Sequence, residues 1–138
     1  MKSTLSTTAQ LPWTPGNPFY GADSVHDGRE LVQLKMLSDR RAEGQGIAFI
    51  VRFSPPEGKL IKLVAVARSE EHVYILAGGY CNHAGEQIRF PNDYGMNPTG
   101  KPHSAFIGQE TTALAVYSDE PDDVRQFEIV DATPPASA

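Results

Sequence analysis

The chain has 138 residues, 40% of them hydrophobic, which is the size of one domain with enough apolar material for a core. Its 12 basic and 17 acidic residues give a net charge of −5, and the basic residues form no cluster, so we expect neither nucleic acid nor an acidic membrane as a partner. The single cysteine, Cys81, cannot form an intrachain disulfide, which is typical of a reducing compartment. No stretch has the apolar length of a signal peptide or a membrane span, so we expect a soluble, cytoplasmic protein.

The two ends of the chain differ in composition from its middle. Residues 1–10 are rich in Ser and Thr and residues 132–138 are rich in Pro and Ala, so we predict flexible termini around one domain, 11–131. Three prolines between Leu11 and Gly21 oppose a regular helix. We therefore expect an extended segment whose aromatic side chains pack on the domain; a lid over a cavity mouth is the alternative.

Short segments with period-two alternation or β-branched residues follow one another along the rest of the chain, and turn residues separate them. Two loop-rich stretches, 91–102 and 118–123, interrupt the series. No segment has a convincing helical period, so the pattern predicts an all-β sandwich or barrel. The predicted strands are 30–37, 47–53, 59–67, 71–77, 87–90, 104–107, 112–117 and 124–130.

Two groups of residues stand at fixed spacings in the middle of the chain; the first is Gly58, Glu71 and Gly78, and the second is Pro98, Gly100 and His103. In these spacings the chain resembles the cupin superfamily, over about residues 30–130. Small single-domain cupins of the anti-sigma-factor and dihydroxyacetophenone-dioxygenase types are the most similar in outline. The resemblance implies an RmlC-like jelly-roll barrel, a double-stranded β-helix, with a ligand or metal site inside.

The metal site that the resemblance implies is incomplete in this sequence. In metal-binding cupins two histidines and a glutamate of the first motif and one histidine of the second hold the ion. Here Val64 and Val66 stand where the first two histidines belong, so only Glu71 and His103 carry over. Two donors hold a divalent ion poorly, so we predict no metal cofactor. A metal site completed by other side chains is the alternative; the candidates are His72, His83 and Cys81, although His72 adjoins Glu71 and should face the other way.

The interior of the barrel is predicted to be apolar. If the motif sets the parity of the strands, Glu71 faces inward together with Val64, Val66, Val73, Ile75 and Ala77. A slip of one residue would place Leu63 and Ala65 inside instead. Either arrangement is typical of a pocket for a small organic ligand. The polar candidates around such a pocket are Tyr74 and Tyr94 as hydroxyl donors, and Lys62 and Arg89 as anchors for a substrate carboxylate.

Two classes of function fit these residues. The first is an enzyme in which His103 and Glu71 form an acid/base couple for isomerisation, dehydration, cyclisation or C–C lysis of a small carbonyl- or hydroxyl-bearing, or aromatic, metabolite. A metal-dependent dioxygenase is the rival within that class. The second is a non-catalytic ligand-binding or dimerisation module, in which the two residues are vestigial. By analogy with cupins, whose sheet edges need cover, we also expect a homodimer.

Overall fold

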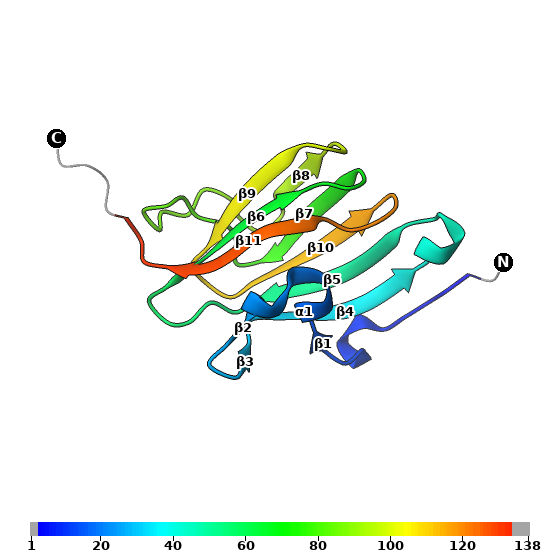
Figure 1. The fold of residues 1–138 in the computed structure, drawn as a ribbon. Helices are drawn as coiled ribbons and strands as arrows, with labels where there is room; N and C mark the ends of the chain where they lie inside the picture. The colour runs from blue at the N-terminus through cyan, green and yellow to red at the C-terminus, as the bar shows by residue number, and fades with distance from the viewer. Residues whose placement is uncertain (1–2, 134–138) are drawn as a thin grey trace.

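The computed structural model describes residues 3–133 and consists of two antiparallel sheets packed face to face (Figure 1). The larger sheet has the order β1 (Thr14–Pro15), β4 (Val32–Asp39), β5 (Ile47–Phe53), β10 (Thr111–Tyr117), β7 (Glu71–Ala77) and β8 (Tyr94–Asn97). The smaller sheet has the order β11 (Asp123–Val130), β6 (Leu60–Val66) and β9 (Pro102–Ile107). A short hairpin joins β2 (Val25–His26) to β3 (Arg29–Glu30). The predicted all-β jelly roll is confirmed.

Between residues 3 and 133, helical structure is confined to single turns, which are η1 (Thr8–Gln10), α1 (Asn17–Tyr20), η2 (Ala22–Ser24) and η3 (Arg41–Glu43). The turn α1 corrects the prediction of an extended segment, because Pro18 lies within its first turn, where a missing N–H costs nothing. Within the described residues, no helix has the length and apolar character needed to cross a membrane.

The strand predictions fail in one region. Residues 87–90 form only an isolated bridge, between Gln87 and Cys81, whereas the stretch expected to be a loop contains the edge strand β8. The strand β8 escapes the sequence pattern because it is short, holds a glycine and has exposed residues on both faces. The termini predicted to be flexible, 1–10 and 132–138, lie partly outside the described residues, at 1–2 and 134–138.

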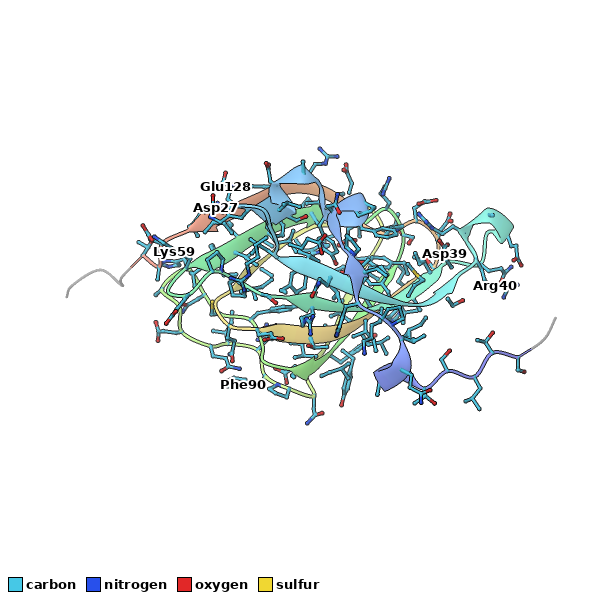
Figure 2. All side chains as sticks on the ribbon, turned by 90° about the horizontal axis from the view of Figure 1, so that it is seen from below. Asp27, Asp39, Arg40, Lys59, Phe90 and Glu128 are labelled. Atoms are coloured by element: carbon cyan, nitrogen blue, oxygen red, sulfur yellow. The ribbon has the colours of Figure 1, made fainter. Side chains whose placement is uncertain are left out.

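The core between the sheets is built mainly from the inward residues of the larger sheet. Along β5, Ile47, Phe49, Val51 and Phe53 are buried, and the residues between them are half-buried on the outer face. This is the alternation that the β-branched and aromatic run predicts. Burial of each such side chain stabilises the fold by about 1.5–3 kcal/mol. In Figure 2 the labelled charged side chains, among them Asp27, Lys59 and Glu128, lie at the perimeter of the molecule.

The N-terminal segment closes one side of the sandwich. The turn α1 contacts β4 of the larger sheet and β11 of the smaller one (Figure 1). Phe19 packs against Phe49 at 5.7 Å between ring centroids, and Tyr20 meets Phe53 edge-on at 5.5 Å. Gly16 allows this approach, because a Cβ there would lie 2.7 Å from Val32. The predicted packing of this segment on the barrel is confirmed.

The opposite side of the sandwich is not covered in this way. There β8 is the last strand of the larger sheet and β9 the last strand of the smaller sheet. Within the described residues the two strands share no ladder. The molecule therefore has one closed side, at α1, and an opposite side bounded by the edges of β8 and β9, where Cys81 bridges the end of β9 at Phe106.

Candidate functional site

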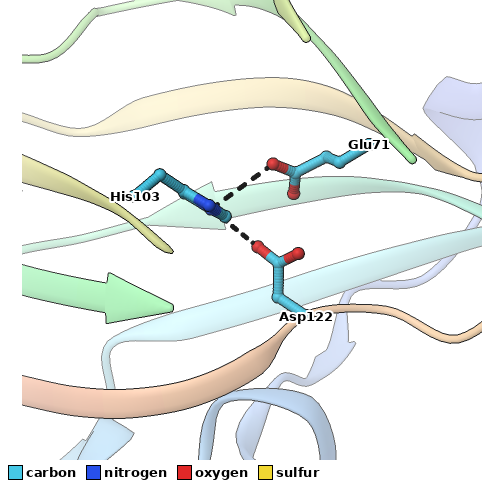
Figure 3. Close-up of side chains that lie close together, drawn as sticks. All are labelled: Glu71, His103 and Asp122. Atoms are coloured by element: carbon cyan, nitrogen blue, oxygen red, sulfur yellow. Dashed lines mark ion pairs between the residues drawn. The ribbon is translucent and has the colours of Figure 1, made fainter. Parts of the chain in front are cut away.

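Three titratable side chains converge between the two sheets (Figure 3). His103 is the second residue of β9, Glu71 is the first residue of β7, and Asp122 immediately precedes β11. His103 Nε2 lies 2.8 Å from Asp122 Oδ2 and 3.4 Å from Glu71 Oε1. One imidazole nitrogen is thus shared by two carboxylates that come from different sheets.

The cluster is largely removed from solvent. The exposed fraction of the side chain is 6% for Glu71, 10% for Asp122 and 22% for His103. Asn97 Nδ2 donates a hydrogen bond to Glu71 Oε1 at 2.7 Å. Two buried atoms, His103 Nδ1 and Asp122 Oδ1, have no hydrogen-bond partner among the described residues. Buried polar atoms without partners are costly, so Asp122 Oδ1 is available to a ligand or water, whereas the His103 ring also interacts with the backbone of Lys101.

The surroundings change the acidity of two members of the cluster. The hydrogen bond to Asp122 raises the pKa of His103 and outweighs the burial that would lower it. Burial, and then the charge of Asp122, raise the pKa of Glu71, although hydrogen bonds from Tyr117 and Asn97 oppose the rise. The cluster therefore favours an imidazolium paired with Asp122 and a glutamate that takes up a proton more readily than an exposed one.

A cavity of about 300 Å³ adjoins the cluster. Its wall is mostly apolar; the residues around it include Val51, Phe53, Leu63, Ala65, Val73, Ile75, Ala115 and Val124. The predicted positions of Val73 and Ile75 agree with this wall.

The prediction that Val64 and Val66 line the cavity is wrong. Ala65 pairs with His103 across the β6–β9 ladder, and directly opposite residues share a face of the sheet. The inward residues of β6 are therefore Leu63 and Ala65, the one-residue slip that the sequence left open. At the end of β7, a register shift against β10 leaves Ala77 exposed instead of inward.

Two of the four predicted polar residues lie at the cavity. Arg89 and Tyr94 are among the residues around it, whereas Tyr74 and Lys62 are not. Tyr94 pairs with Tyr74 on the outer face of the larger sheet, and its hydroxyl is hydrogen-bonded to His72 there. Tyr94 thus borders the cavity from the edge strand, but its hydroxyl is engaged on the outside; His72 faces outward, as the alternation predicts.

Other hydroxyl groups surround the cluster, which the sequence did not single out as polar candidates. Tyr20, Tyr80 and Tyr117 line the cavity, and burial raises the pKa of each phenol. Asp122 was not predicted from the sequence either. It lies in a run of acidic residues, and no sequence pattern distinguishes the one whose side chain faces the cavity. Its neighbour Asp123 instead pairs with Arg125 at the surface.

The metal site that the fold family implies has only some of its usual donor residues in this protein. The inward positions on β6 are Leu63 and Ala65, which have no lone pair, so the strand contributes no ligand. Asp122 adds a third donor to Glu71 and His103, and donor atoms of the three lie within 4.8 Å of one another. Three protein donors are the usual minimum for a catalytic divalent ion, and the unpartnered Asp122 Oδ1 is a further available oxygen. The set fits a divalent ion, with donors that differ from those the sequence suggested.

Comparison with known proteins defines the fold. No protein-family model matches the chain, and no curated protein matches it in sequence. Among solved structures it is similar to an RmlC-like cupin from Shewanella frigidimarina, with 15% identity, coverage of 86% of this chain and 93% of that one, and a TM-score of 0.57. The chain therefore has the cupin fold.

Two enzymes share this fold. The polyketide cyclase RemF from Streptomyces resistomycificus is similar at 15% identity, over 96% of this chain and 87% of that one, with a TM-score of 0.56. An acetylacetone dioxygenase from Acinetobacter johnsonii is similar at 11% identity, over 94% and 89% of the two chains, also with a TM-score of 0.56. At these identities the likeness extends to the fold alone.

Proposed function

We propose that this protein is an enzyme that moves a proton on a small carbonyl- or hydroxyl-bearing, or aromatic, metabolite bound in the cavity. The observation that carries the proposal is the meeting of Glu71, His103 and Asp122 beside an apolar cavity of about 300 Å³. Ligand sites commonly combine an apolar wall with a few convergent polar groups of perturbed pKa. A cavity filled by its own side chains would have favoured the non-catalytic module.

The residues divide into an acid and a base. The His103 imidazolium, held by Asp122, donates its proton to the carbonyl oxygen of the substrate. The Glu71 carboxylate, when ionised, removes a proton from the adjacent carbon, and its raised pKa makes it a stronger base than an ordinary glutamate. The C–H bond breaks, an O–H bond forms and an enol results. Return of a proton to carbon then gives an isomer, or starts a cyclisation or elimination.

Exchange of carbon-bound hydrogen for deuterium tests this chemistry. Acetophenone, phenylacetone and 1-indanone, incubated with the protein in deuterium oxide and followed by NMR, are expected to exchange the hydrogens next to the carbonyl. His103→Gln and Glu71→Gln should each abolish the exchange, whereas the exposed His83→Gln should keep it. If none of the ketones exchanges, or if both cavity variants keep the exchange, the proposed function is wrong.

A second candidate, metal-dependent catalysis, is favoured by the three donors within 4.8 Å. Glu71, His103 and Asp122 would hold the ion, which would supply Lewis-acid polarisation of a substrate oxygen. Isothermal titration with Co²⁺, with Asp122→Asn beside the adjacent Asp123→Asn, separates the two candidates. Stoichiometric binding that only Asp122→Asn weakens would favour the metal; absence of binding would favour proton transfer without it.

We further propose that the protein is a homodimer that pairs through an outer patch on β7, β8 and β10, defined as Tyr74, Leu76, Tyr94, Met96 and Val116. These side chains are 37–60% exposed. They lie on one face of neighbouring strands, and exposed apolar side chains gathered on one face commonly mark an interaction surface. Light scattering should give a dimer for the protein and for Val25→Glu, but a monomer for Val116→Glu; both valines are 39% exposed. A monomeric wild type would refute the pairing.

A further inference from the structure

Among the described residues of its wall, the cavity reaches solvent on only one side of the sandwich. At its inner end the wall is made by buried residues, among them Tyr20, Glu71 and Tyr117. Its exposed residues are Arg89, Tyr94, Gly95 and Ser104, which come from β8, β9 and the segment before β8. The entrance therefore lies between the edge strands β8 and β9, opposite the side that α1 closes.

Gly95 occupies an inward position at this entrance. It pairs with Val73, which faces the cavity, so a side chain at position 95 would point the same way. A Cβ placed on Gly95 meets no atom within 4 Å, and the backbone is outside the left-handed region that favours glycine. Neither backbone conformation nor close packing therefore requires a glycine here.

Glycine nevertheless weakens a strand, because it packs nothing and loses more conformational entropy on folding. In a strand interior it often marks a place where a ligand approaches the backbone. At Gly95 the space that a side chain would fill is the entrance itself. The other polar groups at this entrance are Arg89, Asp93 and Ser104, which can meet a polar substituent of the ligand.

We propose that Gly95 is the specificity-determining residue of the cavity: the ligand enters between β8 and β9 and lies against the bare backbone at Gly95, so this position sets the width of molecule that reaches His103. The inference rests on the proposed small-molecule site and adds its entrance and its size limit. The ligand that fits is flat and small, of one or two rings, because the opening is bounded by two strand edges and the cavity holds about 300 Å³.

Binding of two phenols of different width tests the inference independently of catalysis. Phenol and 2-naphthol are titrated into the protein while NMR follows the ring protons of His103, and both are expected to shift them. In Gly95→Val the affinity for 2-naphthol should fall at least tenfold, whereas that for phenol should fall less than threefold. The matched control is Ile50→Val on β5, whose side chain lies on the outer face of the larger sheet and outside the dimer patch, and it should bind both phenols as the wild type does.

Three results would overturn the inference: no effect of either phenol on His103 in the wild type, equal loss of both in Gly95→Val, or unchanged affinity for 2-naphthol. Thermal unfolding checks that the variant is folded, and if Gly95→Val is not, Gly95→Ala replaces it with an intermediate loss expected. Loss of deuterium exchange with retained size-dependent binding would refute the proton-transfer function but leave the entrance intact.

Discussion

His103 and Asp122 form the shortest contact of the cavity cluster, at 2.8 Å, although 19 positions separate them in the chain. The imidazole comes from β9 and the carboxylate from the turn before β11, which are the two edges of the smaller sheet. Because β6 lies between those edges, only a small inward residue there lets the two side chains meet. Ala65, opposite His103, is such a residue.

The Asp122→Asn variant is expected to lower the pKa of His103. The hydrogen bond to Asp122 is the largest cause of the raised value, and burial, which lowers it, remains in the variant. NMR titration of the His103 ring measures the change. Asp123→Asn serves as the control, and an equal effect of both variants would mean that general charge, not the contact, raises the pKa.

The stability of the fold should depend on pH through the same cluster. Glu71 and His103 have pKa values above 4.5 and 6.5, their ordinary values. A raised folded pKa means that the folded state binds the proton more tightly, so this stability is present below the ordinary value and is lost as pH rises through the folded value. We expect the free energy of unfolding to fall above pH 4.5 and further above pH 6.5.

Urea unfolding over a pH series measures this slope, and the variants separate its two parts. Glu71→Gln should flatten the lower part and His103→Gln the upper part. Asp39, whose pKa is lowered by its hydrogen bond to Arg41, contributes with the opposite sign and at more acid pH. If the stability of the wild type rose with pH relative to that of both variants, from pH 4.5 to above pH 6.5, the assignment would be contradicted.

Histidines placed on β6 test which of its residues face the cavity. Leu63→His combined with Ala65→His should create a site for Ni²⁺ with His103 and Glu71, because all four side chains would face inward. The matched control, Val64→His with Val66→His, places the same residues on the outer face. Calorimetry should show stoichiometric Ni²⁺ binding for the first pair and not for the second; the reverse would restore the register that the motif spacing suggests.

The hydroxyl of Tyr117 is expected to stabilise the cluster. Its hydrogen bond lowers the pKa of Glu71, so Tyr117→Phe should raise that pKa further and cost about 1 kcal/mol of unfolding free energy. Urea unfolding of Tyr117→Phe gives the cost in unfolding free energy. The same measurement over a pH series, with and without Glu71→Gln, gives the pKa of Glu71. Tyr74→Phe, which removes an exposed hydrogen bond to Asn92, is the control and should change stability less.

The fold was predictable because its information is local. The run IAFIVRF has the burial alternation expected of it residue by residue, and β7 begins at Glu71 as the pattern indicates. The exception, β8, carries no such pattern. Its pairing with β7 depends on tertiary contacts, which small exposed residues such as Gly95 do not indicate in the sequence.

The site was predictable only in part. The spacing of the second motif leads to His103, and that of the first leads to Glu71, because each is a short-range signal. Which face of β6 turns inward depends instead on its pairing with β9, and a shift of one residue exchanges the faces without changing any local preference. The choice of Asp122 among its acidic neighbours depends on where the turn before β11 lies in space.

The position of Tyr20 has a consequence for shortened versions of the protein. Its ring belongs both to the N-terminal segment and to the wall of the cavity, where it lies near Tyr117 and Phe53. The residues from β4 onward therefore do not make up a minimal working unit. A chain trimmed of its first twenty-odd residues would keep every strand of both ladders between β4 and β11, yet would hold a ligand in a barrel with one wall missing.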